Sequence, residues 1–227
     1  MNSPVVGALL AVLFGYGCGA LPFGLWIGRI FRGVDVRTLG SGNLGATNVY
    51  RSLGPGLGLL TLLLDAAKGA VPVVLAPHLP GAASLPGGVE TASILAGLAA
   101  VAGHVWTFLA GFKGGKGVAT TAGVLLALSP PAFGVFALVF VVTVALSRYI
   151  SLGSMLGSVA FAIALAWSPG GVMSPRFMVG VAIAVLVILR HRENIARLRR
   201  GEERRFSLRR SSPPPPAAAG GTGAARG

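Results

Sequence analysis

Long apolar stretches recur along most of this sequence, and they limit the possible folds more than any other feature. Of the 227 residues, 53% are hydrophobic and 11% are charged, whereas a soluble domain carries about 25% charged residues. Several stretches approach the roughly 20 apolar residues that cross a bilayer as a helix. Within lipid, a helix satisfies its own backbone hydrogen bonds. We therefore predict an all-α polytopic membrane protein embedded in a lipid bilayer.

Seven membrane spans are predicted, and one of them is short. They cover residues 5–27, 57–76, 90–110, 118–128, 132–147, 152–167 and 177–189. Pro130 and Pro131 divide what would otherwise be one helix, because proline disfavours a continuous helix. The span at 118–128 would then be about 16 Å long at 1.5 Å per residue, against a hydrocarbon core of roughly 30 Å. We expect protein to shelter it, or the span to line a cavity.

Basic residues predict the orientation of these spans. The sequence holds 19 Lys and Arg against 6 Asp and Glu, a formal net charge of +13. The segments after the first, third and last spans carry most of this charge, so the positive-inside rule places them in the cytoplasm and the N-terminus outside. Such a balance can also indicate nucleic-acid binding. Here the charges flank apolar spans, which favours anionic lipid or phosphorylated substrates and no nucleic acid.

A membrane domain at residues 1–206 and a tail are predicted. Residues 207–227 are basic at first and then rich in proline, alanine and glycine, a composition typical of disorder. With seven spans and the N-terminus outside, the C-terminus and this disordered tail lie in the cytoplasm. No function is predicted for the tail.

The first cytoplasmic segment, residues 40–51, reads Gly-Ser-Gly-Asn-Leu-Gly-Ala-Thr-Asn-Val-Tyr-Arg and suits a phosphate group. Backbone N–H groups at glycines attract anions, and arginine pairs bidentately with phosphate. The candidate binding residues are Ser41, Gly42, Asn43, Gly45, Thr47, Asn48 and Arg51. The glycines match G-x-G-x-x-G, but a dinucleotide site would have to follow a buried strand, not a membrane span. An ordinary turn with an N-capping Ser or Asn remains the alternative.

The second cytoplasmic segment, residues 112–121, reads Phe-Lys-Gly-Gly-Lys-Gly-Val-Ala-Thr-Thr. It is not a Walker A loop, because glycine, and not Ser or Thr, follows the second lysine. Its glycines let the backbone approach an anion, and the positive end of the next helix points there. A positive-inside anchor would need the lysines but not the glycines, so phosphate binding is favoured. The candidates are Lys113, Gly114, Gly115, Lys116 and Gly117.

The third cytoplasmic segment, residues 190–205, is strongly basic. His191, Asn194 and Leu198 recur at helical spacing and lie on one face of the predicted helix. A basic helix beside a membrane is most often an anchor, so the histidine alone is weak evidence for a site.

Asp65 and Lys68 lie three residues apart inside an otherwise apolar span. Each would cost roughly 2.5–3.5 kcal/mol at the bilayer centre if it were unpaired. On one helix face they can pair with each other. Two interpretations stay open: a structural ion pair that packs the bundle, which is slightly favoured, or a pair that orients the site.

Together these segments closely resemble the bacterial PlsY family of membrane-integral acyl-phosphate:glycerol-3-phosphate acyltransferases. The resemblance rests on residues 40–51, on Leu-Asp-Ala-Ala-Lys-Gly at 64–69, on Gly-His at 103–104 with the glycine–lysine segment at 111–120, and on Arg-His-Arg-Glu-Asn-Ile at 190–195. It extends to residue 206. One departure is that the family often has an aromatic–proline pair after Gly-His, where this chain has Trp106 and Thr107.

The resemblance implies a seven-span bundle in the cytoplasmic (inner) cell membrane, with its active site facing the cytoplasm. The reaction it implies moves a fatty acyl group from acyl phosphate to the 1-hydroxyl of glycerol 3-phosphate, giving lysophosphatidic acid and inorganic phosphate. The resemblance implies no cofactor and no metal. It implies a monomer, and functional coupling to an enzyme that produces acyl phosphate. The implied site residues are Ser41, Arg51, Lys116, His191 and Asn194, with Ser154 as a weaker member and Asp65, Lys68 and His104 as structural or supporting groups.

Acyl phosphate is an activated mixed anhydride, so the main demands on the protein are positioning and charge stabilisation. We expect Lys116 and the neighbouring N–H groups to hold the acyl phosphate, and the other four central residues to hold glycerol 3-phosphate. The general base stays open between His191 and a substrate phosphate, with the phosphate favoured. No aspartate follows any histidine at the His-x4-Asp spacing of other acyltransferases.

Two other functions are less consistent with the sequence. A phosphatidyltransferase of the CDP-alcohol kind needs clustered aspartates for a divalent metal, and Asp35 and Asp65 are the only aspartates. A transporter for anionic solutes would need polar residues that continue across the membrane. Beyond Asp65 and Lys68 the spans are apolar, which favours a cleft open to one side.

Overall fold

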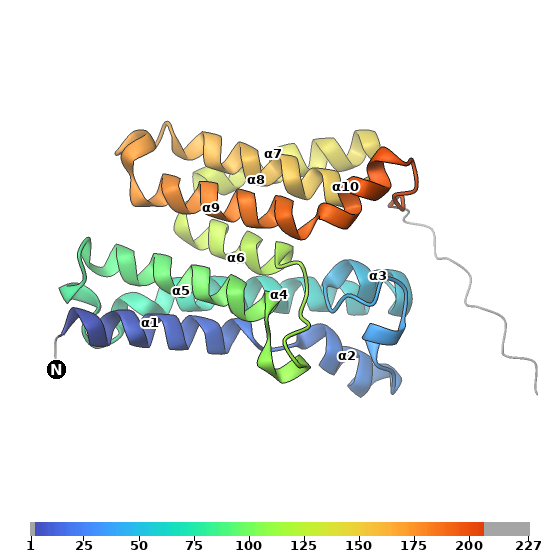
Figure 1. Ribbon diagram of the computed structural model, residues 1–227, viewed down its shortest axis with the longest axis horizontal. Helices are drawn as coiled ribbons and strands as arrows, with labels where there is room; N and C mark the ends of the chain where they lie inside the picture. The colour runs from blue at the N-terminus through green and yellow to red at the C-terminus, as the bar shows by residue number, and fades with distance from the viewer. Residues whose placement is uncertain (1–2, 207–227) are drawn as a thin grey trace, which may run out of the picture.

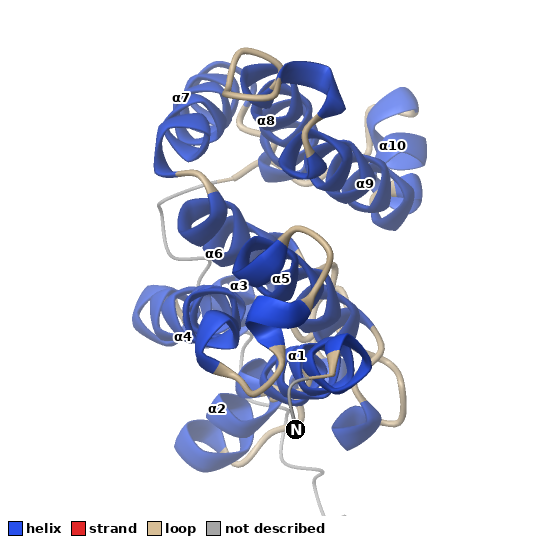
Figure 2. Ribbon diagram, turned by 90° about the vertical axis from the view of Figure 1, so that its left-hand side faces the viewer, coloured by secondary structure: helices blue, strands red, loops and turns tan. Residues whose placement is uncertain are grey.

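The computed structural model describes residues 3–206, and this part of the chain consists of helices joined by loops and turns, without a strand (Figures 1 and 2). The tail predicted at 207–227 lies outside the described residues. The α-helices are α1 Pro4–Gly19, α2 Phe23–Arg32, α3 Ala46–Leu53, α4 Pro55–Leu75, α5 Gly88–Val105, α6 Val118–Leu128, α7 Pro130–Ser147, α8 Ile150–Leu165, α9 Pro175–Arg190 and α10 Arg192–Arg199.

Prolines and serines set where several of the long helices begin. Proline occupies the first position of α1, α4, α7 and α9, where its missing N–H would have had no partner in the helix. The Ser3 hydroxyl oxygen accepts a hydrogen bond from the Val5 N–H at the start of α1. Ser174 caps α9 in the same way through the Phe177 N–H. The predicted division at Pro130 is confirmed, because α6 ends at Leu128 and α7 starts at Pro130.

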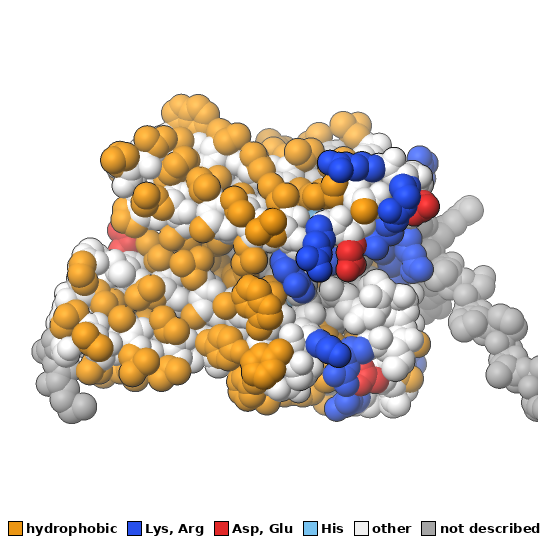
Figure 3. Space-filling model, in the orientation of Figure 1, with side chains coloured by type: hydrophobic (Ala, Val, Ile, Leu, Met, Phe, Trp, Pro, Cys, Tyr) orange, Lys and Arg blue, Asp and Glu red, His pale blue; other side chains and the backbone are white. Residues whose placement is uncertain are grey.

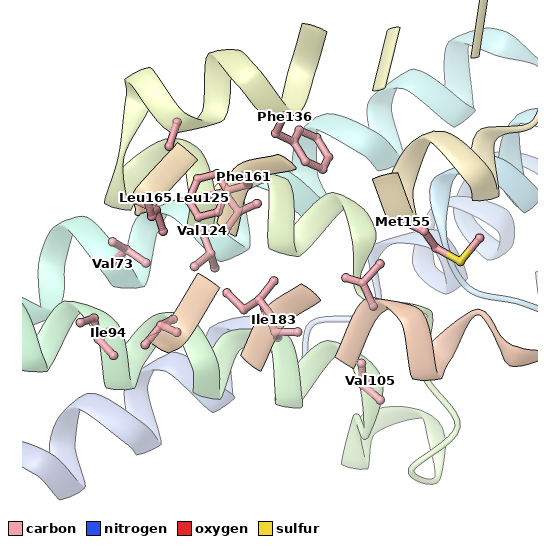
Figure 4. Close-up of a cluster of buried hydrophobic side chains, with 14 residues drawn as sticks. Val73, Ile94, Val105, Val124, Leu125, Phe136, Met155, Phe161, Leu165 and Ile183 are labelled. Atoms are coloured by element: carbon pink, nitrogen blue, oxygen red, sulfur yellow. The ribbon is translucent and has the colours of Figure 1, made fainter. Parts of the chain in front are cut away.

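The long helices run nearly parallel and form two layers joined by α6 (Figures 1 and 2). Helices α1, α4 and α5 pack together in one layer, and α7, α8 and α9 in the other. Helix α6 contacts α4, α5, α7 and α9, so the short span is sheltered by protein as expected. Its Val124 and Leu125 are fully buried in the main apolar core, where they lie near Phe161 and Ile183 (Figure 4).

Small residues let helices approach closely, both within the first layer and between that layer and α6. A Cβ at Gly15 of α1 would collide with the backbone of Ala96 in α5, and one at Gly123 of α6 would collide with the backbone of Ala66 in α4. Such contacts are typical of membrane bundles, because lipid offers no hydrophobic drive for helix association and van der Waals packing must supply it.

The first predicted span, 5–27, is not one continuous helix. Helix α1 ends at Gly19, and α2 starts after Pro22, which lacks the N–H that a continuing helix needs. The break leaves carbonyls that accept hydrogen bonds from buried side chains of other segments. Lys68 Nζ donates to the Leu21 carbonyl at 2.6 Å, and the Thr107 hydroxyl donates to the Ala20 carbonyl.

Two other predicted boundaries differ from the structure. The helix in the span predicted at 90–110 ends at Val105, and a 3-10 turn, η4 Phe108–Ala110, follows. The loop predicted between the first two spans contains α3, Ala46–Leu53, and a second 3-10 turn, η1 Val36–Thr38. Within residues 3–206, four helical segments are long and apolar enough to cross a membrane, namely Pro4–Arg32, Pro55–His78, Gly88–Ala110 and Pro130–Ser147; α6 and α8 are apolar but shorter.

Charge is concentrated at one end of the bundle. Lys and Arg side chains gather at the end that holds α2, α3 and α10, while apolar side chains cover most of the remaining face in view (Figures 1 and 3). On α7, Leu138, Val141 and Leu146 are 65%, 61% and 83% exposed, which suits contact with lipid. We refer to the end with α2, α3 and α10 as the basic end.

Candidate active site

The glycine–lysine loop, residues 111–117, folds back along the end of α5 and leads into α6. The Gly115 N–H donates to the His104 carbonyl and the Gly114 N–H to the Val105 carbonyl, both at 3.2 Å. A side chain at Gly115 would collide with the His104 imidazole, so this loop can lie so close to α5 only with glycine. Gly117, at φ +82°, caps α6 in the left-handed region that favours glycine.

Lys116 extends from this loop to the third cytoplasmic segment. Its Nζ donates to Oδ1 of Asn194 in α10, so two predicted site residues meet. Burial lowers the pKa of Lys116, and the nearby Arg197 acts in the same direction. Arg190 ties the same two segments together, because its Nη2 donates to the Gly115 carbonyl at 3.1 Å.

His191 lies at the junction of α9 and α10 and is only 3% exposed. Its Nδ1 is 2.7 Å from the Val187 carbonyl oxygen, so Nδ1 carries a proton that it donates there. Burial lowers the pKa of His191 to about 4. The imidazole is therefore neutral near pH 7, and only Nε2 can accept a hydrogen bond.

Arg51 brings the first segment to the third. From α3 its Nη2 donates to the Arg204 carbonyl at 3.2 Å, and the neighbouring Tyr50 ring lies 5.5 Å from the Phe206 ring, measured between centroids. Burial lowers the pKa of Arg51, and the adjacent Arg204 adds to the effect. All three predicted segments therefore reach the basic end. Contacts join the first segment to the third and the second segment to the third.

The two asparagines of the first segment shape its loop. Asn48 is buried, and its Nδ2 donates to the carbonyls of Val36, Leu39 and Asn43 at 2.9–3.1 Å, while its Oδ1 accepts from the Ser41 N–H at 2.9 Å. The Asn43 Oδ1 accepts from the Gly45 N–H at 2.7 Å. The amide of Asn48 is thus committed to the backbone around it.

Ser41 lies at the surface of this loop. Its side chain and Gly42 are exposed, and within the described chain the Ser41 hydroxyl forms no hydrogen bond. Thr47 is half-buried at the start of α3, and Lys113 is exposed in the glycine–lysine loop. The Ser41 hydroxyl is therefore available to a ligand.

Ser154 does not join the cluster around Lys116. It is buried, and its hydroxyl donates to the Ile150 carbonyl of its own helix at 2.9 Å. Ser151, one turn earlier on the same face of α8, reaches the cluster in its place, since its hydroxyl donates to Glu203 Oε1 at 2.7 Å.

Glu203 is the residue that sequence reasoning missed. Its carboxylate accepts hydrogen bonds from Ser151, from Asn194 Nδ2 at 2.6 Å and from Arg197 Nε at 2.8 Å. The available signal was Gly201, because a glycine just after a basic helix marks a chain reversal. At φ +71° it turns the chain back toward α8.

Asp65, Lys68 and His104 form a buried polar cluster beneath the glycine–lysine loop. Lys68 Nζ lies 2.7 Å from Asp65 Oδ1, and His104 Nδ1 lies 3.8 Å from the same oxygen. The predicted ion pair is present. It contacts the break between α1 and α2 through Lys68 and supports the loop through His104, so it links the bundle to the site.

Comparison with known proteins gives a consistent result. The family model described as glycerol-3-phosphate acyltransferase matches residues 9–201. A glycerol-3-phosphate acyltransferase of Anaeromyxobacter dehalogenans is 46% identical over 205 residues, covering 90% of this chain and 100% of that protein. One of Geobacter sulfurreducens is 46% identical over 205 residues, covering 89% and 99%.

Two solved structures are also similar. Both are crystal structures of PlsY (YgiH), an integral membrane glycerol 3-phosphate acyltransferase. The glycerol 3-phosphate form has a TM-score of 0.78 at 40% identity, covering 88% of this chain and 96% of that one. The lysophosphatidic acid form has a TM-score of 0.76 at 40% identity, covering 88% and 95%.

Proposed function

Because the chain belongs to the glycerol-3-phosphate acyltransferase family, we propose that it acylates the 1-hydroxyl of glycerol 3-phosphate with acyl phosphate as the donor. The products are lysophosphatidic acid and inorganic phosphate, so this is the first acylation of phospholipid synthesis. The observation that carries the proposal is the meeting of three phosphate-suited segments at the basic end, with Lys116 bonded to Asn194 at their centre.

Lys116 and the glycine–lysine loop hold the acyl phosphate in this proposal. The lysine cation and the loop N–H groups, including those of Lys116 and Gly117, stabilise the charge that grows on phosphate as the acyl carbon–oxygen bond breaks. The loop also leads into the positive end of α6. Asp65, Lys68 and His104 support the loop from below, and the acyl chain lies among apolar side chains of the bundle.

Ser41, Arg51, His191 and Asn194 hold glycerol 3-phosphate. Arg51 supplies a bidentate phosphate ligand, and the exposed Ser41 hydroxyl is available to the same substrate. With both substrates bound, the glycerol hydroxyl oxygen attacks the acyl carbonyl carbon, and phosphate departs with the bonding electron pair. Holding the two reactants together supplies much of the rate enhancement.

The proton released by the glycerol hydroxyl passes to a substrate phosphate in this mechanism. His191, with a pKa of about 4, is a weak base near pH 7, whereas a phosphate monoester has its second pKa at about 6. An efficient base has a pKa close to the working pH, which favours the phosphate. His191 then serves as a neutral hydrogen-bonding group.

The proposed topology has seven spans, the N-terminus outside and the site facing the cytoplasm from the inner cell membrane. Two features support it. The basic end would face the cytoplasm under the positive-inside rule, and α1 begins at the opposite end of the bundle from α10, as an odd number of spans requires (Figure 1). We further propose a monomer that is supplied by an enzyme producing acyl phosphate.

Acyl transfer by the purified protein tests the proposed function. With synthetic acyl phosphate and glycerol 3-phosphate, the wild type should release lysophosphatidic acid and free phosphate in equal amounts without added metal. Lys116→Ala should lower kcat by about 100-fold or more. Arg199→Ala, which removes an exposed charge from α10, is the matched control and should be near wild type. No product from a folded protein would overturn the proposal and favour anion transport.

A further inference from the structure

The carboxylate of Glu203 lies at the centre of the hydrogen bonds of the basic end. It connects Ser151 of α8 with Asn194 and Arg197 of α10 at 2.6–2.8 Å. The Glu203 side chain is 7% exposed, although it lies beyond the last helix. Its neighbour Glu202 is 57% exposed and pairs with Arg200 at 2.7 Å. Of the two adjacent glutamates, the Glu203 side chain is therefore buried and that of Glu202 is exposed to solvent.

Residues 201–206 are fixed at several points along their length. The Glu202 N–H donates to the Arg197 carbonyl at 2.8 Å, and the Phe206 N–H donates to the Arg148 carbonyl at 2.6 Å. Arg51 and the Tyr50 ring contact the same segment from α3. The Glu203 carboxylate is therefore held in a constant position relative to α3, α8 and α10.

The carboxylate determines which way the Asn194 amide points. An ionised carboxylate can only accept hydrogen bonds, so it requires the NH₂ end of the amide. Asn194 Nδ2 donates to Glu203, and the oxygen end is left facing Lys116. A lysine ammonium can only donate, so the orientation set by Glu203 is the one that lets Asn194 hold Lys116.

The charge of Glu203 also suits this role. Burial acts to raise the pKa of the Glu203 carboxyl, but the hydrogen bonds from Arg197, Asn194 and Ser151 together outweigh it, and the pKa is lowered. The group is therefore ionised near neutral pH. The same negative charge helps to keep Lys116 protonated, because Glu203 acts to raise the pKa of that lysine.

We propose that Glu203 is a positioning residue for acyl transfer, which orients the Asn194 amide so that Lys116 is held ready for phosphate. This inference rests on the proposed function, in which Lys116 stabilises the departing phosphate. An opposite role would be a carboxylate that occupies the phosphate position and is displaced by substrate. Kinetics distinguish the two roles. Removing a positioning group lowers kcat, whereas removing a competitor of the substrate lowers KM.

Glu203→Gln and Glu202→Gln form a matched pair for the test, since they make the same change at adjacent positions. Gln at 203 keeps the size of the side chain but replaces one accepting oxygen with an NH₂ group, which faces either Arg197 or the pair Ser151 and Asn194. We expect its kcat to fall by about tenfold or more, with the KM for glycerol 3-phosphate unchanged or raised. The alkaline limb of its pH–rate profile should move to lower pH, because Lys116 loses a stabilising anion. Glu202→Gln should match the wild type in both.

A double-substitution cycle tests whether Glu203 acts through Asn194. If it does, Glu203→Gln should add little to the loss caused by Asn194→Ala, and fully additive losses would overturn the proposal. A lower KM with unchanged kcat in Glu203→Gln would also overturn it, in favour of a displaceable carboxylate. If Glu203→Gln does not fold, Ser151→Ala removes one donor to the same carboxylate and should lower kcat by about two- to fivefold; wild-type kinetics would overturn the proposal.

The controls separate this inference from the proposed function. If the wild type and Glu202→Gln release no product from acyl phosphate, the proposed function fails. If both turn over normally and Glu203→Gln does too, only the positioning role fails.

Discussion

At the residue scale, side chains of the basic end are oriented by groups that are themselves held in place. His191 donates from Nδ1 to a backbone carbonyl, and this bond sets both its tautomer and its ring orientation. The Asn48 amide forms hydrogen bonds with four backbone groups and so fixes the loop that presents Ser41. In the proposed mechanism such preorganisation is needed because the reaction depends mainly on placing the glycerol hydroxyl against the acyl carbon.

The pH dependence of His191→Gln tests the source of the general base. With its pKa lowered from 6.5 to about 4, His191 is neutral throughout pH 5–8, so its titration cannot produce an acid limb in that range. We expect the wild type and His191→Gln to share the same acid limb of kcat/KM, with turnover within about tenfold. His78→Gln, in the 3-10 turn Ala76–His78 that follows α4, is the control. Loss of an acid limb near pH 6.5 in His191→Gln alone would identify this imidazole as the base.

The sequence indicated some site residues and not others for a physical reason. Lys116 and Asn194 could be proposed together because each lies in a dense local motif. Glu203 could not, because its role depends on a reversal at Gly201 that returns the chain to Ser151, 52 positions away in sequence. The family resemblance pointed to Ser154, but Ser151 on the same side of α8 is the serine that meets the returning segment. Spacing along the helix cannot show which of the two does so.

At the scale of elements, the apolar pattern of the sequence predicts some helix boundaries and not others. The break at 130–131 could be predicted, since two adjacent prolines interrupt a long run. The break before α2 could not, because apolar residues continue on both sides of Pro22 and no change in composition marks it. The carbonyls freed there are satisfied by Lys68 and Thr107, which lie in distant segments that the sequence does not connect.

Close packing of α6 against α4 should be sensitive to a single added methyl group. Gly123→Ala places a Cβ against the Ala66 backbone, and overpacking of this kind costs about 1–3 kcal/mol. Gly134→Ala makes the same change on α7, where no described residue lies within 4 Å of the new Cβ, and should be neutral or stabilising by up to about 1 kcal/mol. Thermal unfolding in detergent compares the two. Equal midpoints would show that α6 can move away from α4 at little cost.

At the scale of the whole molecule, the two layers meet along α6, and the glycine–lysine loop leads directly into that helix (Figure 1). Arg51 lies on α3, which packs against α4 of the first layer, whereas His191 follows α9 of the second. The site therefore lies where both layers contribute side chains, at the basic end. The distribution of charge in the sequence predicted that the basic segments lie on one side of the membrane. The arrangement of the two layers depends on packing between distant helices, which no local sequence pattern predicts.

The proposed topology can be checked by labelling single cysteines. In a Cys18→Ser background, Val172→Cys places a thiol on an exposed turn before α9, and Arg200→Cys places one at the basic end. A membrane-impermeant thiol reagent should label position 172 in intact cells and position 200 only after the membrane is opened. The reverse pattern would show that the basic end faces outward and that the positive-inside rule fails for this chain.

Confinement of the phosphate-suited segments to one end has a consequence for membrane growth. Lysophosphatidic acid made there keeps its acyl chain in the bilayer and its phosphate in the adjoining water, so each turnover adds material to a single leaflet. That leaflet expands while the opposite one does not. Balanced growth of the two leaflets then depends on a separate step that carries lipid from one side to the other.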